Sequence, residues 1–235
     1  MPRPELDHLA LLVGLQDEFA ATIPLVDPAT PIPWLPRWRV SNLVVHLARI
    51  HHWAAAQARR QQETPLGRGP FVLDEFYAEY AKELRDTLAE LGPDAVSWTL
   101  VGNGPASWWR RRQLHETLVH LHDLRAPVGL PVEVAPQVWA DTVDEVVTVM
   151  QPRQVRLDRM AALPQRIALV ADDAGAGWVF EAAETAGHET AVTVRGPARS
   201  LALLLWGRLR ADDEALAVEG DRELLDDALG RRLTP

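Results

Sequence analysis

The stretch LHETLVHLHD (114–123) concentrates three histidines and two carboxylates in ten residues of a chain that has eight histidines among 235 residues. On an α-helix each residue turns by about 100°, so positions four apart lie only about 40° from each other. Glu116 and His120 therefore project from one face, and Asp123 falls on the same stripe. His115 precedes His120 by five residues and points about 140° away, which does not suit a shared ion.

The same spacing argues against a metalloprotease motif. H-E-x-x-H would need a histidine at position 119, where the chain has Val119. Two ligands on one helix make only half a site, because a catalytic zinc commonly has three protein ligands and an open position. The best third ligand is His46, whose neighbours Leu43 and Leu47 place it on or beside a buried helix face.

Two interpretations of His46, Glu116 and His120 stay open on spacing alone. Carboxylates and imidazoles that project inward from neighbouring helices are a known way to build a metal site in a bundle. The alternative is a hydrogen-bonded core histidine together with a solvated helix pair. The run RRR (110–112) is interpreted as a solvated helix face, although one of its members can reach a cleft.

Composition limits the possible functions. Apolar residues make up 47% of the chain, and 33 acidic against 24 basic residues give a net charge of −9, which argues against a nucleic-acid binder. There is no cysteine, so any metal site must use His, Asp and Glu. The start of the chain does not resemble a signal peptide, and the apolar run SLALLLW (200–206) is too short to span a bilayer. We expect a soluble, cytoplasmic protein, monomer or homodimer, with no membrane partner.

Residues 1–155 are predicted to form a helical domain. Apolar periodicity and Pro/Gly interruptions predict one helix that ends before Pro24 and a fifth helical stretch that starts after Pro136. The remaining predicted helices span 40–62, 71–91 and 107–125. Four long helices with short links and one longer crossover predict an up-down bundle.

Residues 156–235 have a different pattern, typical of a small α+β domain. Short segments rich in β-branched and aromatic residues, separated by glycine-containing turns, predict strands. These segments are QRIALVADD (165–173), GWVFEAA (177–183), ETAVTVRG (189–196) and ALAVEGD (215–221). Helices are predicted for PARSLALLLWGRLR (197–210) and RELLDDALGRRL (222–233). The fold class is therefore a helical bundle followed by an α+β domain.

Three segments resemble the mycothiol-dependent maleylpyruvate isomerase family. They are WRVSNLVVHLARIHHWAA (38–55), RRQLHETLVHLHDLRAPVG (111–129) and TAVTVRGPARSLALLLWGRLRADDEALAVEGDRELLDDAL (190–229). The resemblance implies a DinB-like four-helix bundle that carries a divalent metal, usually zinc, followed by a sterol-carrier-protein-like α+β domain. It also places the family's metal ligands on His46, Glu116 and His120.

The resemblance further implies a thiol cosubstrate, the actinobacterial thiol mycothiol. A metal with an open position can bind a thiol and lower its pKa, and a chain without cysteine needs an external sulfur nucleophile. In an isomerase the thiolate adds to a conjugated double bond of a small electrophile, allows rotation and leaves. In an S-transferase it stays attached.

Two more residues match the family pattern. Asp123 is either an outer partner of a ligand histidine or a helix-end residue. Arg195, in TVRGP (193–197), is either a surface arginine at a turn or the residue that anchors a carboxylate or sugar hydroxyl of the substrate or thiol.

Two other classes of function remain open. One is a non-catalytic ligand-binding or regulatory protein that keeps the fold and the metal site. The other is a metal-dependent hydrolase, for which Asp123 is the visible candidate general base.

Overall fold

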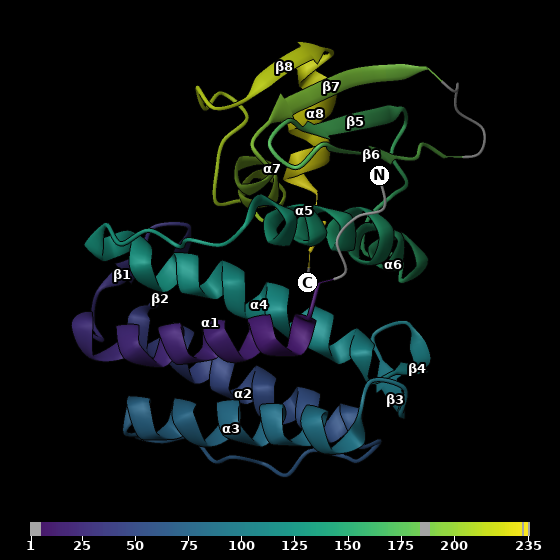
Figure 1. Ribbon diagram of the computed structural model, residues 1–235. Coiled ribbons are helices and arrows are strands. Elements are labelled where there is room, and N and C mark those ends of the chain that lie inside the picture. The colour runs from purple at the N-terminus through teal and green to yellow at the C-terminus, as the bar shows by residue number, and fades with distance from the viewer. Residues whose placement is uncertain (1–5, 184–188, 232, 235) are drawn as a thin grey trace. The chain divides into compact units, whose positions relative to one another are not determined.

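The computed structural model describes residues 6–183, 189–231 and 233–234. The chain forms two compact units, residues 1–132 and 133–235 (Figure 1). This division lies earlier than the 155/156 boundary expected from the sequence, because α5 (Pro136–Glu145) packs against α7 (Ala198–Leu205) within the second unit. A π-helical segment (Val146–Met150) and α6 (Gln151–Arg156) continue α5 without a break.

The first unit is a bundle of four long helices. They are α1 (His8–Thr22), α2 (Val40–Ala58), α3 (Leu73–Leu91) and α4 (Ser107–Arg125). The helix predicted for 40–62 ends at Ala58, since Arg60 adopts a left-handed φ of 58°. Side chains from all four helices fill the core, and the largest fully buried ones include Leu12, Phe19, Leu43, Leu47, Tyr77, Leu84, Leu88, Trp109, Leu114 and Leu118.

Alternation of helix direction, which the sequence predicts, is interrupted between α2 and α3. His52 pairs with Glu83, and Arg59, seven residues later, pairs with Glu90, also seven residues later. Because residue numbers increase in the same direction along both helices, α2 and α3 run parallel. The connection 59–72 makes this possible. Its 14 residues can extend about 46 Å, whereas a 19-residue helix such as α2 or α3 is about 28 Å long. The connection is therefore long enough to run back along the full length of α2 before α3 begins.

The contact between α2 and α4 is antiparallel. His46 lies beside His120 at 5.2 Å between ring centroids, and Trp53 lies beside Trp109 at 5.2 Å. Short hairpins extend from the helix ends: β1 (Pro31–Ile32) pairs with β2 (Leu35–Arg39), and β3 (Val96–Thr99) pairs with β4 (Gly102–Pro105). Single 3₁₀ turns, Ile23–Leu25 and Ala126–Val128, follow α1 and α4.

The second unit contains a four-stranded mixed sheet in the order β6-β5-β7-β8. Its strands are β5 (Arg166–Ala171), β6 (Ala176–Phe180), β7 (Thr190–Gly196) and β8 (Ala217–Gly220). β5 and β7 are parallel, and the other pairs are antiparallel. Alternate residues of β5 and β7 are buried, and α7 packs against both strands while α8 (Arg222–Gly230) packs against β7. All four predicted strands are present.

No helix among the described residues has both the length and the apolar character needed to cross a bilayer.

We predict that Gly220→Ala destabilises the second unit. Gly220 has a φ of +102°, and a Cβ there would lie 2.2 Å from the carbonyl oxygen of Ala191 on β7. Backbone strain alone costs roughly 1–3 kcal/mol. Gly230→Ala is the matched control, because its Cβ would meet nothing within 4 Å. Thermal unfolding should show a clear drop for Gly220→Ala only, and equal melting temperatures for the two variants would contradict this account of β8.

Candidate metal centre

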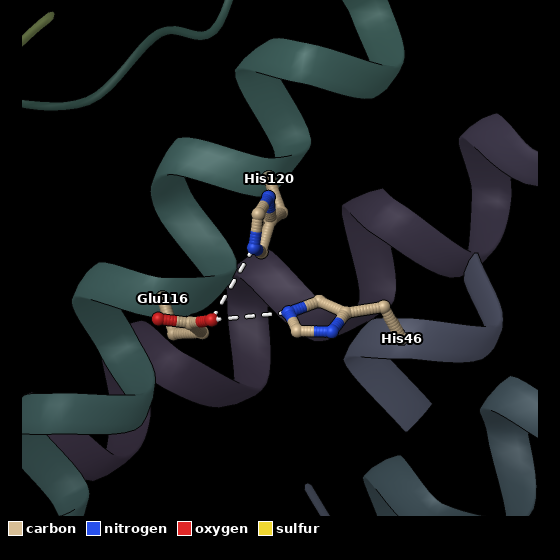
Figure 2. A group of neighbouring side chains, drawn as sticks. All are labelled: His46, Glu116 and His120. Carbon is tan, nitrogen blue, oxygen red and sulfur yellow. Dashed lines mark ion pairs between the residues drawn. The ribbon is translucent and has the colours of Figure 1, made fainter. Parts of the chain in front are cut away.

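The candidate centre is built on one face of α4. Glu116 and His120, four residues apart, bring the Nε2 atom of His120 to 3.2 Å from the Oε1 atom of Glu116. From α2, the Nε2 atom of His46 reaches the same Oε1 atom at 3.5 Å. Figure 2 shows this one carboxylate oxygen facing both imidazoles. One helix thus supplies two of the three groups, and its antiparallel neighbour supplies the third.

These three side chains fit a divalent metal ion. Their ligand atoms all lie within 4.8 Å of one another. Zinc binds imidazole nitrogen and carboxylate oxygen at about 2.0–2.2 Å, and two ligands at tetrahedral angles then lie about 3.3 Å apart. The observed separations of 3.2 and 3.5 Å agree with this value. Two imidazoles and one carboxylate also form a common ligand set of catalytic zinc.

The second oxygen of Glu116 has a different partner. Arg112 lies one helical turn before Glu116 on α4, and its Nη2 atom forms an ion pair with Oε2. Arg112 is only 3% exposed. This pair leaves Oε1 to face the histidines. The interpretation of 110–112 as a solvated face is therefore wrong for Arg112. Its spacing of four residues from Glu116 is the sequence signal that could have identified it.

His120 is held through its other ring nitrogen. Its Nδ1 atom lies 3.0 Å from Oδ2 of Asp123, and Asp123 is fully buried. When Nδ1–H donates to this carboxylate, the lone pair of Nε2 is directed toward Glu116 and His46. Asp123 thus contacts the side of the imidazole opposite to the cluster.

Charge is concentrated at this cluster. Burial opposes ionisation of Glu116, but the Arg112 guanidinium and hydrogen bonds with His120 and His46 outweigh it and hold the pKa of this carboxyl well below its usual range. Burial likewise disfavours the His120 imidazolium, but hydrogen bonds to Asp123 and Glu116 outweigh it and raise the pKa of His120 to about 9. A cation bound through Nε2 would take the place of this proton, since metal ligands must be deprotonated.

Both units match sequence models of one family. The model described as "Mycothiol maleylpyruvate isomerase N-terminal domain" matches residues 12–125. The model described as "MDMPI C-terminal domain" matches residues 137–227. The chain belongs to the mycothiol maleylpyruvate isomerase family. The family predicted from the three sequence segments is confirmed.

Solved structures of the same family share the fold. A crystal structure of the mycothiol-dependent maleylpyruvate isomerase is similar with a TM-score of 0.61, 16% identity, and coverage of 92% of this chain and 93% of that one. A histidine-to-alanine mutant of a mycothiol-dependent maleylpyruvate isomerase gives a TM-score of 0.60 at the same identity and coverage. No curated protein sequence matches the chain. The predicted fold class, a helical unit followed by a small mixed-sheet unit, is confirmed.

The two other histidines of α2, His51 and His52, contact residues outside the candidate metal centre. The Nδ1 atom of the fully buried His51 lies 2.8 Å from Oε1 of Gln113, and burial lowers the pKa of His51 to about 4. His52 lies 2.6 Å from Oε2 of Glu83 through Nδ1. Both imidazoles thus contact residues other than Glu116 and His120.

The histidines that flank His120 on α4 also contact other residues. The His115 ring is fully buried and lies nearly perpendicular to the His8 ring, at 6.5 Å between centroids. The His122 ring stacks on Trp34 at 6.3 Å.

Arg195 belongs to the second unit. It lies on β7, its side chain is 50% exposed, and its Nη1 atom donates to Oδ1 of Asp172 at 2.7 Å. The two residues also line a cavity of about 340 Å³ together with Asp173 and Glu214. Its assignment as a binding residue stays a hypothesis.

We predict that Asp123→Ala weakens metal binding by about 10–100-fold, the usual effect of removing an outer partner of a ligand histidine. The reason is the loss of the hydrogen bond that orients His120 and of a nearby negative charge. Asp94→Ala, at an exposed position of the same unit, is the control. Competition with a chromophoric chelator measures both affinities. Equal affinities would show that Asp123 is a structural residue at the end of the helix only.

Proposed function

We propose that the protein is a metal-dependent, mycothiol-dependent isomerase or S-transferase. In this proposal His46, Glu116 and His120 hold a divalent ion, and the thiol attacks a small electrophilic molecule. The observation that carries the proposal is the single oxygen, Oε1 of Glu116, that faces two imidazole nitrogens at ligand spacing. Membership in a family named for mycothiol and maleylpyruvate isomerase supports the choice of thiol and reaction class.

Zinc suits this ligand set best, because two imidazoles and one carboxylate leave a position open in a tetrahedral site. A bound zinc ion supplies one kind of chemistry here, the lowering of the pKa of a thiol that occupies the open position. The chain contains no cysteine, so the reacting sulfur must come from outside.

The protein's own residues orient the centre. The side chains of Glu116 and His120 are 12% and 6% exposed, whereas that of His46 is 31% exposed. A thiol therefore approaches most readily from the His46 side. Arg112 fixes the Glu116 carboxylate through Oε2, and Asp123 fixes the His120 ring through Nδ1.

The two reaction outcomes differ in the fate of one bond. Thiolate addition to a conjugated double bond forms a C–S bond and moves the π electrons onto the electrophile's carbonyl group. The former carbon–carbon double bond is then a single bond and can rotate. Return of the electrons and cleavage of the C–S bond regenerate the thiolate with no net proton transfer. In a transferase the C–S bond persists and the adjacent carbon takes a proton.

Arg195 is part of this proposal as a residue that binds the thiol or the substrate. A guanidinium has five N–H donors, and its Nη1 contact with Asp172 leaves others for a carboxylate or a sugar hydroxyl. The half-exposed side chain makes these donors accessible from solvent.

We predict that metal content and mycothiol binding are lost together in His46→Ala. Loss of a direct ligand should weaken metal affinity by more than about 100-fold, since outer partners alone contribute about 10–100-fold. His122→Ala is the matched control, because His122 is half-buried on the same helix as His120 and stacks on Trp34. Elemental analysis of the purified proteins and calorimetric titration with mycothiol measure the two quantities.

Stoichiometric metal in His46→Ala would contradict the ligand assignment. A wild-type protein that holds metal but gives neither heat with mycothiol nor thiol-dependent turnover would favour a non-catalytic ligand-binding protein.

A further inference from the structure

The three candidate metal ligands are held by different kinds of contact. Arg112 engages the second oxygen of Glu116, and Asp123 contacts the second ring nitrogen of His120. His46 has no comparable partner, because among the described residues only Glu116 lies within ion-pair or hydrogen-bond distance of its ring nitrogens. Histidines that bind metal usually have an outer partner that fixes the ring. The orientation of His46 must therefore depend on packing.

Packing around His46 is incomplete on one side. Its side chain is 31% exposed, the most of the three ligands, and it borders a cavity of about 850 Å³. The wall of this cavity also contains Arg37, Arg49 and Arg68, which come from three separate elements. A ligand side chain keeps a productive geometry only when its neighbours lock its rotamer. The aromatic rings beside His46 thus decide where its Nε2 atom lies.

Two such rings pack against His46. The His120 ring lies at 5.2 Å between centroids with an interplanar angle of 86°. The Trp38 ring lies closer, at 4.8 Å and 67°. Steeply inclined ring pairs at about 4.5–7 Å are favourable, because the edge and the face of an aromatic ring carry opposite partial charge. Since His120 is itself a candidate ligand, Trp38 is the residue that contributes ring packing from outside the ligand set.

Trp38 is carried by the β1–β2 hairpin, which is anchored at the start of α2. The residue lies near the end of β2, and α2 begins at Val40. The N–H of Val40 donates to the carbonyl oxygen of Thr30 at 2.9 Å. The N–H of Ser41 donates to the carbonyl oxygen of Pro28, also at 2.9 Å. These bonds fix the hairpin, and with it the indole, relative to the helix that supplies the third ligand.

The same hairpin places a second tryptophan against a second histidine. Trp34, in the turn between β1 and β2, stacks on His122 of α4 at 6.3 Å and 16°. The hairpin therefore contacts each of the two ligand-bearing helices through one indole. His122 is not one of the three candidate ligands. Trp34 thus provides an internal comparison for Trp38.

We propose that Trp38 is a positioning residue for the candidate metal centre. Its indole holds the imidazole of His46 in the orientation in which Nε2 faces Oε1 of Glu116. The inference rests on the proposed function, because it takes His46 as a metal ligand. Trp38 acts on the ion through His46 and is not itself a ligand. Ring packing thus does for His46 what the buried carboxylate of Asp123 does for His120.

The test is metal affinity in the absence of thiol, measured by competition with a chromophoric chelator. We expect Trp38→Ala to bind metal about three- to tenfold more weakly, the range that an aromatic pair contributes. Loss should be partial, because Glu116 and His120 still offer two ligands. Trp38→Phe keeps a flat ring and should stay within about twofold of wild type. Trp34→Ala is the matched control and should bind metal like wild type.

Thermal unfolding of the metal-free proteins checks that each variant is folded. Where Trp38→Ala does not fold, Trp38→Leu replaces it, because leucine restores apolar bulk without a flat ring. The same weakening of metal affinity is expected for this variant. Unchanged affinity in the folded variant that lacks the indole, or equal weakening in Trp34→Ala, would overturn the positioning role.

The orientation of His46 is a second readout that needs no metal. Diethyl pyrocarbonate acylates the unprotonated nitrogen of an imidazole, and peptide mass spectrometry identifies each modified histidine. We expect His46 of metal-free Trp38→Ala to react at least about twofold faster than in wild type, because the lost ring pair no longer holds it. Trp34→Ala should change the rate at His122 and leave that at His46 unchanged. Weaker metal binding with an unchanged rate at His46 would contradict the proposal.

Failure of the proposed function is seen separately. Metal affinity that depends on Trp38, in a protein with no thiol-dependent turnover, would support the positioning role and reject the proposed reaction. Wild-type protein that binds no metal would overturn both.

Discussion

The candidate metal centre depends on one carboxylate oxygen that two imidazoles share. Oε1 of Glu116 faces His120 on its own helix and His46 on α2, and the other oxygen is taken by Arg112. A carboxylate and two imidazoles at this depth are costly to bury unless they are paired or bind a cation. The antiparallel contact of α2 and α4 is therefore a requirement of the site as well as of the core. Asp123 completes the arrangement by fixing the His120 ring from its far side.

The direction of α3 has a consequence for the cavity beside His46. Because α3 runs parallel to α2, the chain needs the long connection 59–72 to return before α3 starts. This connection carries Arg68 and Phe71 to the cavity wall. The same topological feature that departs from a simple alternating bundle thus supplies charge and apolar surface next to the candidate metal ligands.

Local periodicity accounts for what the sequence could predict. The spacing of Glu116 and His120 fixes a common helix face, and apolar neighbours place His46 next to a core, so helical geometry selects these three residues as candidates. That they bind a metal was implied by the family resemblance. The positions of the four bundle helices and of the four strands of the second unit followed from the same kind of pattern, whereas the short β1–β2 and β3–β4 hairpins were not predicted. The exposure predicted for Arg112 was wrong. A run of three arginines suggests a solvated face, but Arg112 pairs with Glu116, one helical turn later on the same helix.

Long-range arrangement could not be predicted in this way. The parallel α2–α3 pair depends on the path of a connection that has no periodicity. Packing of α5 against α7, which places the division of the chain before residue 133, is likewise a contact between distant segments. The cavity arginines come from three separate elements, and only the fold brings Arg37, Arg49 and Arg68 together.

The most direct test of the metal centre is the absorption spectrum of the cobalt(II)-substituted protein during titration with mycothiol. If His46, Glu116 and His120 hold the ion and leave a position for the thiol, mycothiol should produce a near-ultraviolet thiolate-to-cobalt charge-transfer band at one equivalent. The same titration of Glu116→Ala should give no band. A cobalt-loaded wild-type protein whose spectrum does not respond to mycothiol would contradict the central claim.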